Sequence, residues 1–307
     1  ADACGSGVPE TDAPSSWHGT HVAGIVGAQA FNGLGGSGVA PDVGILPVRV
    51  LGRCGGYTSD IVDAMYWAAG FDVSGVPANA HPADVISMSL SAVTAASCSQ
   101  AYSDAISQAR AAGTLVVVAA GNLSGNASSY PPGNCPSAFT VAATTRSGSR
   151  AYYSNYGSVV DIAAPGGSMN FASDPNGILS TVNTGVQAPE ADDYGYMQGT
   201  SMATPHVAGV AALLYAAVDN LGVNLDVDTL EAALRNSARA FPGSCVGCGA
   251  GIVNASAALA LVDGSFVPVA AADVALTLKG NTGKFVKDAA NPGQGTIQYI
   301  AQITNKG

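Results

Sequence analysis

A sequence of 307 residues, 48% of them hydrophobic and only 10% charged, can bury a large core and must cover its surface mainly with small polar residues. Its net charge of −10 argues against nucleic-acid binding, which needs a basic face. The longest uninterrupted apolar run, residues 207–218, is about half of the roughly 20 residues of a membrane-spanning helix, so no membrane span is expected.

The first predicted element is a helix in "SSWHGTHVAGIVGA", residues 15–28. Short runs that are apolar throughout come next and are predicted to be strands: residues 43–51, 84–90, 114–122, 138–145 and 159–166. Apolar runs without polar alternation are typical of strands in a sheet that is covered on both faces.

Helical spacing occurs between these runs. Apolar residues recur at i, i+3, i+4 and i+7 within residues 61–68 and again within residues 102–109, and Gly113 follows as a C-cap. This alternation predicts an α/β fold with a three-layer, doubly wound, mostly parallel sheet. Ligands bind such sheets beyond the carboxyl ends of the strands, so functional residues are expected there.

A second helix, in "GTSMATPHVAGVAALL" at residues 199–214, has an unusual start. Its body is small and apolar, yet its first turn carries Thr200, Ser201 and a proline, Pro205, which the orphan N–H groups of a helix start make tolerable. Ser201 is either a helix cap, the commoner role, or a nucleophile that needs a base and an oxyanion site elsewhere. His206 is interpreted as a packed core histidine.

Histidine supplies the candidate base. His18 and His21 lie one turn apart at the start of the first helix. Metal binding by this pair is the alternative, but the sequence has neither the Glu of an H-E-x-x-H motif nor an evident third ligand. We interpret His18 as a base that the positive end of the helix keeps neutral, and His21 as structural.

Asn122 is the candidate oxyanion donor. It follows Gly121 at the end of the most apolar run, where an asparagine can also be an ordinary turn residue. Its side-chain amide and the backbone N–H of Ser201 would offer two donors to a developing negative charge. Chemistry of this kind needs no cofactor for catalysis.

Six cysteines indicate three disulfides formed in an oxidising compartment. Zinc binding by the C-x-x-C pair at 245 and 248 is disfavoured, because no second C-x-x-C and no nearby histidine completes a site. The predicted pairs, one of 15 connectivities that six cysteines allow, are Cys4–Cys54, Cys98–Cys135 and Cys245–Cys248.

The character of the chain changes after residue 262. Residues 263–272 are predicted to link a domain at residues 1–262 to a segment at residues 273–307, whose end alternates apolar and polar side chains. Two or three strands in so short a segment cannot bury a stable sandwich. The segment is therefore predicted to be the start of a β-sandwich module.

Several blocks resemble the signature blocks of the subtilisin-like serine endopeptidases (subtilases, peptidase family S8), in that family's order: "HGTHVAG" (18–24), "SMSLS" (87–91), "VVVAAGN" (116–122), "YSNYG…DIAAPG" (153–166) and "GTSMATPHVAG" (199–209). The cysteine-containing loops, "VRVLGRCGGYTSDI" in particular, are most similar to the secreted extracellular proteases of Gram-negative bacteria. The terminal segment resembles repeated β-sandwich modules of bacterial surface and secreted proteins.

The resemblance implies a serine endopeptidase with Ser201 as nucleophile, His18 as general base and then acid, and Asn122 as oxyanion donor. It also implies segments that pair with an extended peptide and a pocket for the side chain before the scissile bond. These substrate-binding residues would be Gly55, Gly56 and Tyr57, then Ser89, Leu90 and Ser91, and around the pocket Ser128, Ser129 and Tyr130. The expected partner is a protein or peptide, and the expected state is a secreted bacterial monomer.

Two departures from the family pattern matter. Ser91 stands where the family usually has glycine, so its Cβ is expected to crowd the substrate backbone or favour small residues. The D-[ST]-G block that carries the catalytic acid is missing, since neither Asp2 nor Asp12 has that context. We expect the chain to begin after this block, with an incomplete triad and weak or no activity. The alternative is a non-catalytic surface or binding protein that retains the protease fold.

"AQAFNGLGGSGVAP", residues 28–41, resembles the family's calcium-binding loop, with Asn32 as the matching side-chain ligand. Calcium prefers such oxygen ligands, but at least one carboxylate ligand would lie in the missing block. The resemblance therefore implies a structural calcium. The acidic run at residues 189–193 is interpreted as a solvated loop.

Overall fold

The structure is a computed structural model that describes residues 14–52, 55–219, 225–262, 274–276 and 303–305. The chain divides into two compact units, Ala1–Ser265 and Phe266–Gly307. In the second unit, β7 (Val274–Leu276) pairs antiparallel with β8 (Ile303–Asn305). The predicted linker, residues 263–272, lies outside the described residues.

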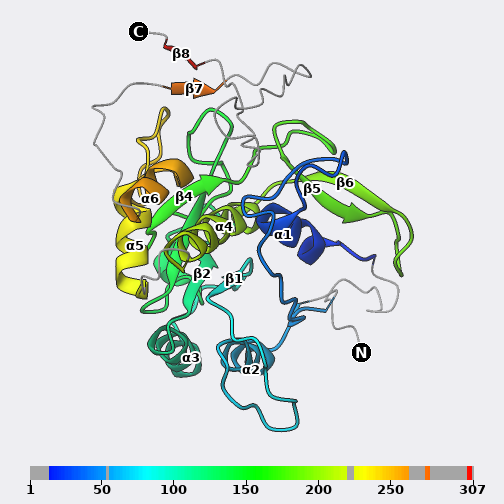
Figure 1. Cartoon of the computed structure of the whole chain (residues 1–307), viewed down its shortest axis with the longest axis vertical. Coiled ribbons are helices and arrows are strands. Elements are labelled where there is room, and N and C mark those ends of the chain that lie inside the picture. Colours follow the sequence, from blue (N-terminus) through cyan, green and yellow to red (C-terminus); the bar gives the residue numbers. More distant parts are fainter. Residues whose placement is uncertain (1–13, 53–54, 220–224, 263–273, 277–302, 306–307) are drawn as a thin grey trace, which may run out of the picture. The chain divides into compact units, whose positions relative to one another are not determined.

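A four-stranded parallel sheet forms the centre of the first unit (Figure 1). Its strands, in spatial order, are β1 (Val85–Met88), β2 (Leu115–Ala119), β3 (Phe139–Thr144) and β4 (Ile162–Pro165). Every residue of β2 and β3 is buried, as expected for continuous apolar runs. The structure thus confirms a parallel α/β sheet built from the apolar runs that begin near residues 84, 114, 138 and 159.

Helices cover both faces of this sheet. Successive strand residues point to opposite faces, so alternate side chains of one strand pack against different helices. Leu115 and Val117 pack in one cluster with α4 and α5, whereas Val116 and Val118 pack in another with α2 and α3. Figure 1 shows α2 and α3 together at the bottom of the view and α4 crossing the sheet. These helices are α2 (Thr58–Ala68), α3 (Gln100–Ala111), α4 (Thr200–Asp219), α5 (Val227–Asn236) and α6 (Ala255–Val262).

The expected strand at residues 43–51 is wrong, because this segment is irregular in the structure. Ile45, Leu46 and Val48 are each between 38% and 43% exposed. Pro47 has no N–H to donate to a ladder. Among the described residues, no strand pairs with the outer edge of β1, so the apolar run has no neighbouring strand with which to form a ladder.

An antiparallel hairpin was not expected from the sequence. It consists of β5 (Ile178–Asn183) and β6 (Asp192–Met197) and packs against α1 (His18–Gly27). Gly24 allows this close approach, since a Cβ there would lie 2.1 Å from the Thr181 Oγ1. Two hydroxyl groups tie the hairpin to α1: Ser180 donates to the His21 carbonyl at 2.8 Å and Thr181 to the Thr20 carbonyl at 2.9 Å.

Two disulfides are present in the described part of the chain, Cys98–Cys135 and Cys245–Cys248. Both match the predicted pairing, whereas Cys4 and Cys54 lie outside the described residues. By length and composition alone, α4 is long and apolar enough to cross a membrane, but 61% of its most apolar window is buried inside the unit. The helix therefore serves as a core helix here.

Candidate active site

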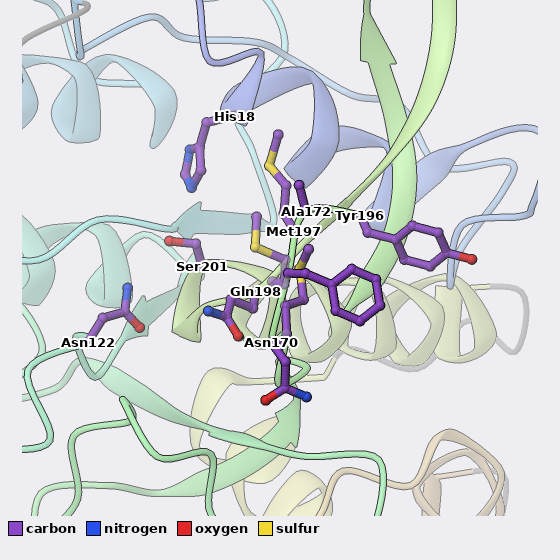
Figure 2. Close-up of a pocket in the computed structure, with 11 residues that line it drawn as sticks. His18, Asn122, Asn170, Ala172, Tyr196, Met197, Gln198 and Ser201 are labelled. Carbon is purple, nitrogen blue, oxygen red and sulfur yellow. Dashed lines mark hydrogen bonds between the residues drawn. The ribbon is translucent and has the colours of Figure 1, made fainter. Parts of the chain in front are cut away.

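The starts of α1 and α4 meet the carboxyl end of β2 at one cavity of about 690 Å³. His18 is the first residue of α1, Ser201 is the second residue of α4, and Asn122 follows β2. All three line the cavity. Figure 2 shows the His18 ring, the Ser201 hydroxyl and the Asn122 amide facing one shared space.

Ser201 is held against the segment that follows β1. Its hydroxyl donates to the Ser89 carbonyl at 3.3 Å, and its own carbonyl accepts from the Ser89 hydroxyl at 2.7 Å. The neighbouring backbone N–H groups are engaged, since Thr200 donates to Asn122 and Met202 donates to Gly199. No described residue accepts a hydrogen bond from the Ser201 N–H, so this donor at the helix start is left for a ligand.

Asn122 is oriented by its carbonyl end. The Asn122 Oδ1 accepts from the Thr200 N–H at 2.8 Å and from the Thr200 hydroxyl at 2.9 Å. With the oxygen fixed in this way, the amide nitrogen faces Ser201 and the cavity (Figure 2). The side chain thus caps α4 through its oxygen and presents an N–H donor beside the Ser201 N–H, a two-donor arrangement suited to an oxyanion.

The half-buried His18 imidazole has a pKa below its usual value. Burial is the larger cause and the nearby charge of His21 is the second, since both disfavour the imidazolium. The positive end of α1 acts in the same direction. A neutral ring beside a serine hydroxyl can accept that hydroxyl's proton. Among the described residues, no salt bridge joins His18 to a carboxylate.

His21 has a different environment from His18. Its ring is fully buried, and its Nε2 lies 2.9 Å from the Ile178 carbonyl and 3.0 Å from the Gly195 carbonyl. Because both partners are acceptors, Nε2 carries the proton and the ring clamps the β5–β6 hairpin onto α1. His206 lies in the body of α4, where its Nδ1 is 2.8 Å from the Met202 carbonyl one turn earlier.

The segments expected to bind an extended substrate do not line the cavity. Residues 89–91 adjoin Ser201 through Ser89, and a Cβ built on Gly121 would be 2.8 Å from the Ser91 Oγ. Tyr57 is the 77% exposed N-cap of α2, and Gly55 bridges to Gly52. Ser129 ends a short 3₁₀ helix, Ala127–Ser129, next to Tyr130.

One wall of the cavity was missed by the sequence interpretation. It comes from the loop between β4 and β5 and from the end of β6, and its residues are Met169, Asn170, Phe171, Ala172, Tyr196, Met197 and Gln198. The β6 residues directly precede the Gly199–Ser201 motif, and the loop follows the carboxyl end of β4. Those positions were available signals, because ligands bind at this edge of a parallel sheet.

The Asn32 loop, residues 28–41, contains no carboxylate of its own for a calcium ion. The Asn32 Oδ1 accepts a hydrogen bond from the Leu34 N–H at 2.9 Å, and the side chain is exposed. Calcium takes six to eight oxygen ligands, usually with carboxylates among them. No cluster of three potential acidic, histidine or cysteine ligands occurs in the described parts of the chain.

A serine at a helix start, a neutral imidazole and two converging N–H donors form the arrangement that serine hydrolases use for acyl transfer. The model of the subtilase family matches residues 3–257 of this chain. The chain therefore belongs to the subtilase family.

Individual relatives agree with this assignment. The chain is 51% identical over 260 residues to an extracellular protease of Xanthomonas campestris pv. campestris, covering 84% of this chain and 42% of that protein. It is 45% identical over 251 residues to an extracellular basic protease of Dichelobacter nodosus, covering 81% and 40% respectively. A solved protease structure from Pseudoalteromonas arctica matches with 54% identity and a TM-score of 0.78, covering 81% of this chain and 72% of that chain. The chain thus spans about two fifths of the length of the two curated relatives, 42% and 40%.

Proposed function

We propose that this protein is a secreted bacterial serine endopeptidase that works through an acyl-enzyme. The observation that carries the proposal is the orientation of Asn122, whose oxygen is fixed by Thr200 so that its nitrogen faces the Ser201 hydroxyl. The Asn122 Nδ2 and the Ser201 N flank one point, since a Cβ built on Gly199 would lie 3.5 Å from each. Two fixed donors at this point stabilise charge that appears on a carbonyl oxygen only during reaction.

The chemistry follows from the same residues. His18 takes the proton of the Ser201 hydroxyl as Oγ attacks the peptide carbonyl, and the oxyanion is held by Asn122 and the Ser201 N–H. His18 then gives that proton to the departing amine as the peptide C–N bond breaks. Water, deprotonated by His18, releases the acyl group and restores Ser201.

The substrate is proposed to be a protein or peptide in extended form. Residues 55–57 and 89–91 would pair with its backbone as an added strand, and Ser129 would help to wall the pocket for the residue before the scissile bond. Ser89 supports this placement, because it is hydrogen bonded directly to Ser201. The Ser91 hydroxyl lies toward Gly121, so its crowding effect is expected on the oxyanion side of the peptide.

The 307-residue polypeptide itself is proposed to be weakly active. Its sequence has no D-[ST]-G block before His18, and His18 has no carboxylate partner among the described residues. An acid orients the imidazole and stabilises its cation, and its loss costs about four orders of magnitude in rate, a magnitude that comes from this same family. The rival proposal, a non-catalytic binding protein that retains the fold, has only this missing carboxylate in its favour.

Secretion is supported by the two disulfides, which persist in oxidising compartments, and by the extracellular relatives.

The protein is proposed to be a monomer. Residues 273–307 are proposed to be the start of a β-sandwich module, of which β7 and β8 would be a part. A structural calcium at Asn32 needs a carboxylate that the described loop does not supply. No catalytic step is assigned to it.

Labelling with a fluorophosphonate probe tests the proposal. The 307-residue polypeptide is compared with Ser201→Ala and His18→Ala, and with Ser107→Ala, an exposed serine on α3, as the control. Circular dichroism checks folding. We expect the unmodified 307-residue polypeptide and Ser107→Ala to label slowly, and Ser201→Ala and His18→Ala not to label. The rival proposal, a non-catalytic binding protein, would be favoured if the well-folded polypeptide did not label and a longer product of the same gene did not label either.

A further inference from the structure

The cavity beside Ser201 extends away from the segments proposed to bind the acyl part of the substrate. None of residues 55–57, 89–91 or Ser129 lines it. Figure 2 shows Ala172, Tyr196 and Met197 on the side of Ser201 that lies away from Asn122. His18 also lines the cavity, so a departing amine that takes its proton from His18 could occupy this space.

Asp174 organises the loop that forms this wall, residues 168–177. The side chain is 2% exposed, which is rare for a carboxylate unless its oxygens are well paired. One oxygen accepts from the Asn170 backbone N–H at 2.9 Å and its side-chain amide at 3.3 Å. The other accepts from the backbone and the side chain of Asn176, both at 2.9 Å.

These hydrogen bonds, the Asn176 backbone first, hold the pKa of Asp174 below its usual value. Asp174 thus joins the two ends of the loop, and Ser168 closes it by donating to the Asn176 carbonyl at 3.0 Å. Ser173, directly before Asp174, has a φ of 65°, a conformation that a serine keeps only when its surroundings enforce it.

Gln198 connects this loop to the nucleophile segment. Its Oε1 accepts from the Met169 N–H at 2.5 Å, and its side-chain N–H group donates to the Tyr152 hydroxyl at 3.0 Å. Because Gln198 precedes Gly199 and Ser201 by only a few residues, the position of the loop is fixed relative to the reacting hydroxyl.

The wall that is held in this way carries three large apolar side chains beside the polar ones of Asn170, Tyr196 and Gln198. Met169, Phe171 and Met197 contribute two thioethers and a phenyl ring, and among the described residues that line the cavity only His18 can carry a charge at neutral pH. Phe171 is 64% exposed, so a large apolar side chain of the substrate could cover it and remove apolar surface from water. Methionine side chains adapt to different shapes.

We propose that Asp174 is a positioning residue that holds residues 168–177 as the leaving-group wall of the active site, and that this wall favours a large apolar residue directly after the scissile bond. The inference rests on the proposed endopeptidase function. It concerns the amine half of the substrate, which the residues assigned above do not bind.

The test uses the full-length protein and internally quenched peptides with one acyl sequence, followed by Phe, Leu or Gly after the scissile bond. We expect kcat/KM for Phe and Leu to exceed that for Gly by about tenfold, the scale of apolar discrimination in enzyme pockets. In Asp174→Asn, an amide N–H group would face the donors of Asn170 and Asn176 and loosen the loop. The Phe-to-Gly ratio should then fall to within about twofold of unity.

A second variant, Phe171→Ala, removes part of the wall without touching the Asp174 hydrogen bonds and should lower the same ratio. The control is Asp63→Asn, an exposed aspartate on α2, which should leave the Phe-to-Gly ratio unchanged.

Acyl transfer gives an independent measurement. Phenylalaninamide attacks the acyl-enzyme, the ester bond to Ser201 breaks, and His18 carries the amine's proton to the Ser201 oxygen. Asp174→Asn should need about tenfold more phenylalaninamide to divert half of the acyl groups from water.

The outcomes separate this inference from the proposed function. If the unmodified protein does not hydrolyse a methyl ester of the same acyl sequence, the endopeptidase proposal fails and the inference fails with it. If it hydrolyses the ester but does not discriminate between Phe and Gly, only the inference is wrong. Equal losses of kcat/KM for all three peptides in Asp174→Asn would show a role in general stability and would also overturn the inference.

Discussion

Asn122 has a separate role at each end of its amide group. The oxygen accepts two hydrogen bonds from Thr200 and so caps α4, whereas the nitrogen faces the cavity. Alanine removes both roles together, but aspartate keeps an acceptor for Thr200 and lacks the donor. The pair of substitutions therefore separates helix capping from oxyanion stabilisation.

We expect Asn122→Asp to lower the acylation rate of the full-length protein by about 10²–10³-fold, because one oxyanion donor is lost. Its melting temperature should change by less than about 2 °C, since the cap acceptor remains. Asn122→Ala should lose a similar factor in rate and in addition about 1 kcal/mol of stability. Stopped-flow acylation and thermal unfolding measure both. A normal rate in Asn122→Asp would remove Asn122 from the oxyanion site.

The lowered pKa of His18 predicts the pH dependence of the 307-residue polypeptide. Only the neutral ring accepts the serine proton, and burial and His21 both keep the pKa of His18 below its ordinary value of 6.5. The labelling rate should therefore stay constant down to below pH 6.5 and fall only at more acidic pH. A carboxylate beside the ring would favour the imidazolium, so the labelling rate would fall at a higher pH. A midpoint above pH 6.5 would reveal such a charge and contradict the prediction.

The sequence predicted the residues whose setting is a short motif at a strand end or a helix start, namely His18, Asn122 and Ser201. It did not predict the wall around Phe171. That wall depends on how Asp174 folds its loop through contacts with Asn170 and Asn176, and hydrogen bonds of this kind leave no periodic pattern in a sequence.

At the scale of elements, an ion-pair network joins α3, α5 and the start of β4. Glu231 on α5 pairs with Arg110 on α3 and, at 3.0 Å, with Arg235 one turn later on its own helix. Arg235 also binds Asp161 at 2.8 Å. Asp228 pairs with Arg110 as well, but its side chain is 89% exposed whereas that of Glu231 is 8% exposed.

This difference in exposure predicts different losses of stability. Glu231→Gln should cost about 3 kcal/mol of unfolding free energy, because Arg110 and Arg235 both lose the shared carboxylate of Glu231, whose side chain is 8% exposed. Asp228→Asn is the matched control, on the same helix and with the same Arg110 partner, and should cost less than about 1 kcal/mol. Urea unfolding compares them. Equal losses would mean that the depth of burial does not determine the strength of this network.

Strand predictions were confirmed where the apolar run has neighbouring strands to pair with. The apolar runs that contain β2 and β3 lie between neighbouring strands, and the structure shows them as buried strands. Residues 43–51 have a similar composition but no described partner, and they form no strand. The β5–β6 hairpin was missed because its strands are half-exposed and rich in polar residues. Apolar content alone therefore predicts only strands that are covered on both faces.

At the scale of the whole molecule, the outer edge of β1 bears on how an acid could reach His18. Within the described residues, β1 has only β2 as a neighbour, and the apolar side chains of Ile45, Leu46 and Val48 remain partly exposed. A strand added at this edge could pair with the backbone of β1, which has no partner on that side among the described residues. If that strand also carried an aspartate, its carboxyl end would lie at the edge of the sheet where His18 is found.

The last prediction concerns this edge. We expect a polypeptide whose extra strand brings an aspartate to His18 to label with fluorophosphonate about 10⁴ times faster than the 307-residue polypeptide. The product expressed from the natural start codon of the gene is the polypeptide to compare, with Asp→Asn in any D-[ST]-G block that it contains as the control. The labelling rate of this longer polypeptide should also begin to fall at a higher pH, because the added carboxylate raises the pKa of His18. Equal rates and equal pH profiles for the two polypeptides would show that the acid is not what limits the 307-residue polypeptide.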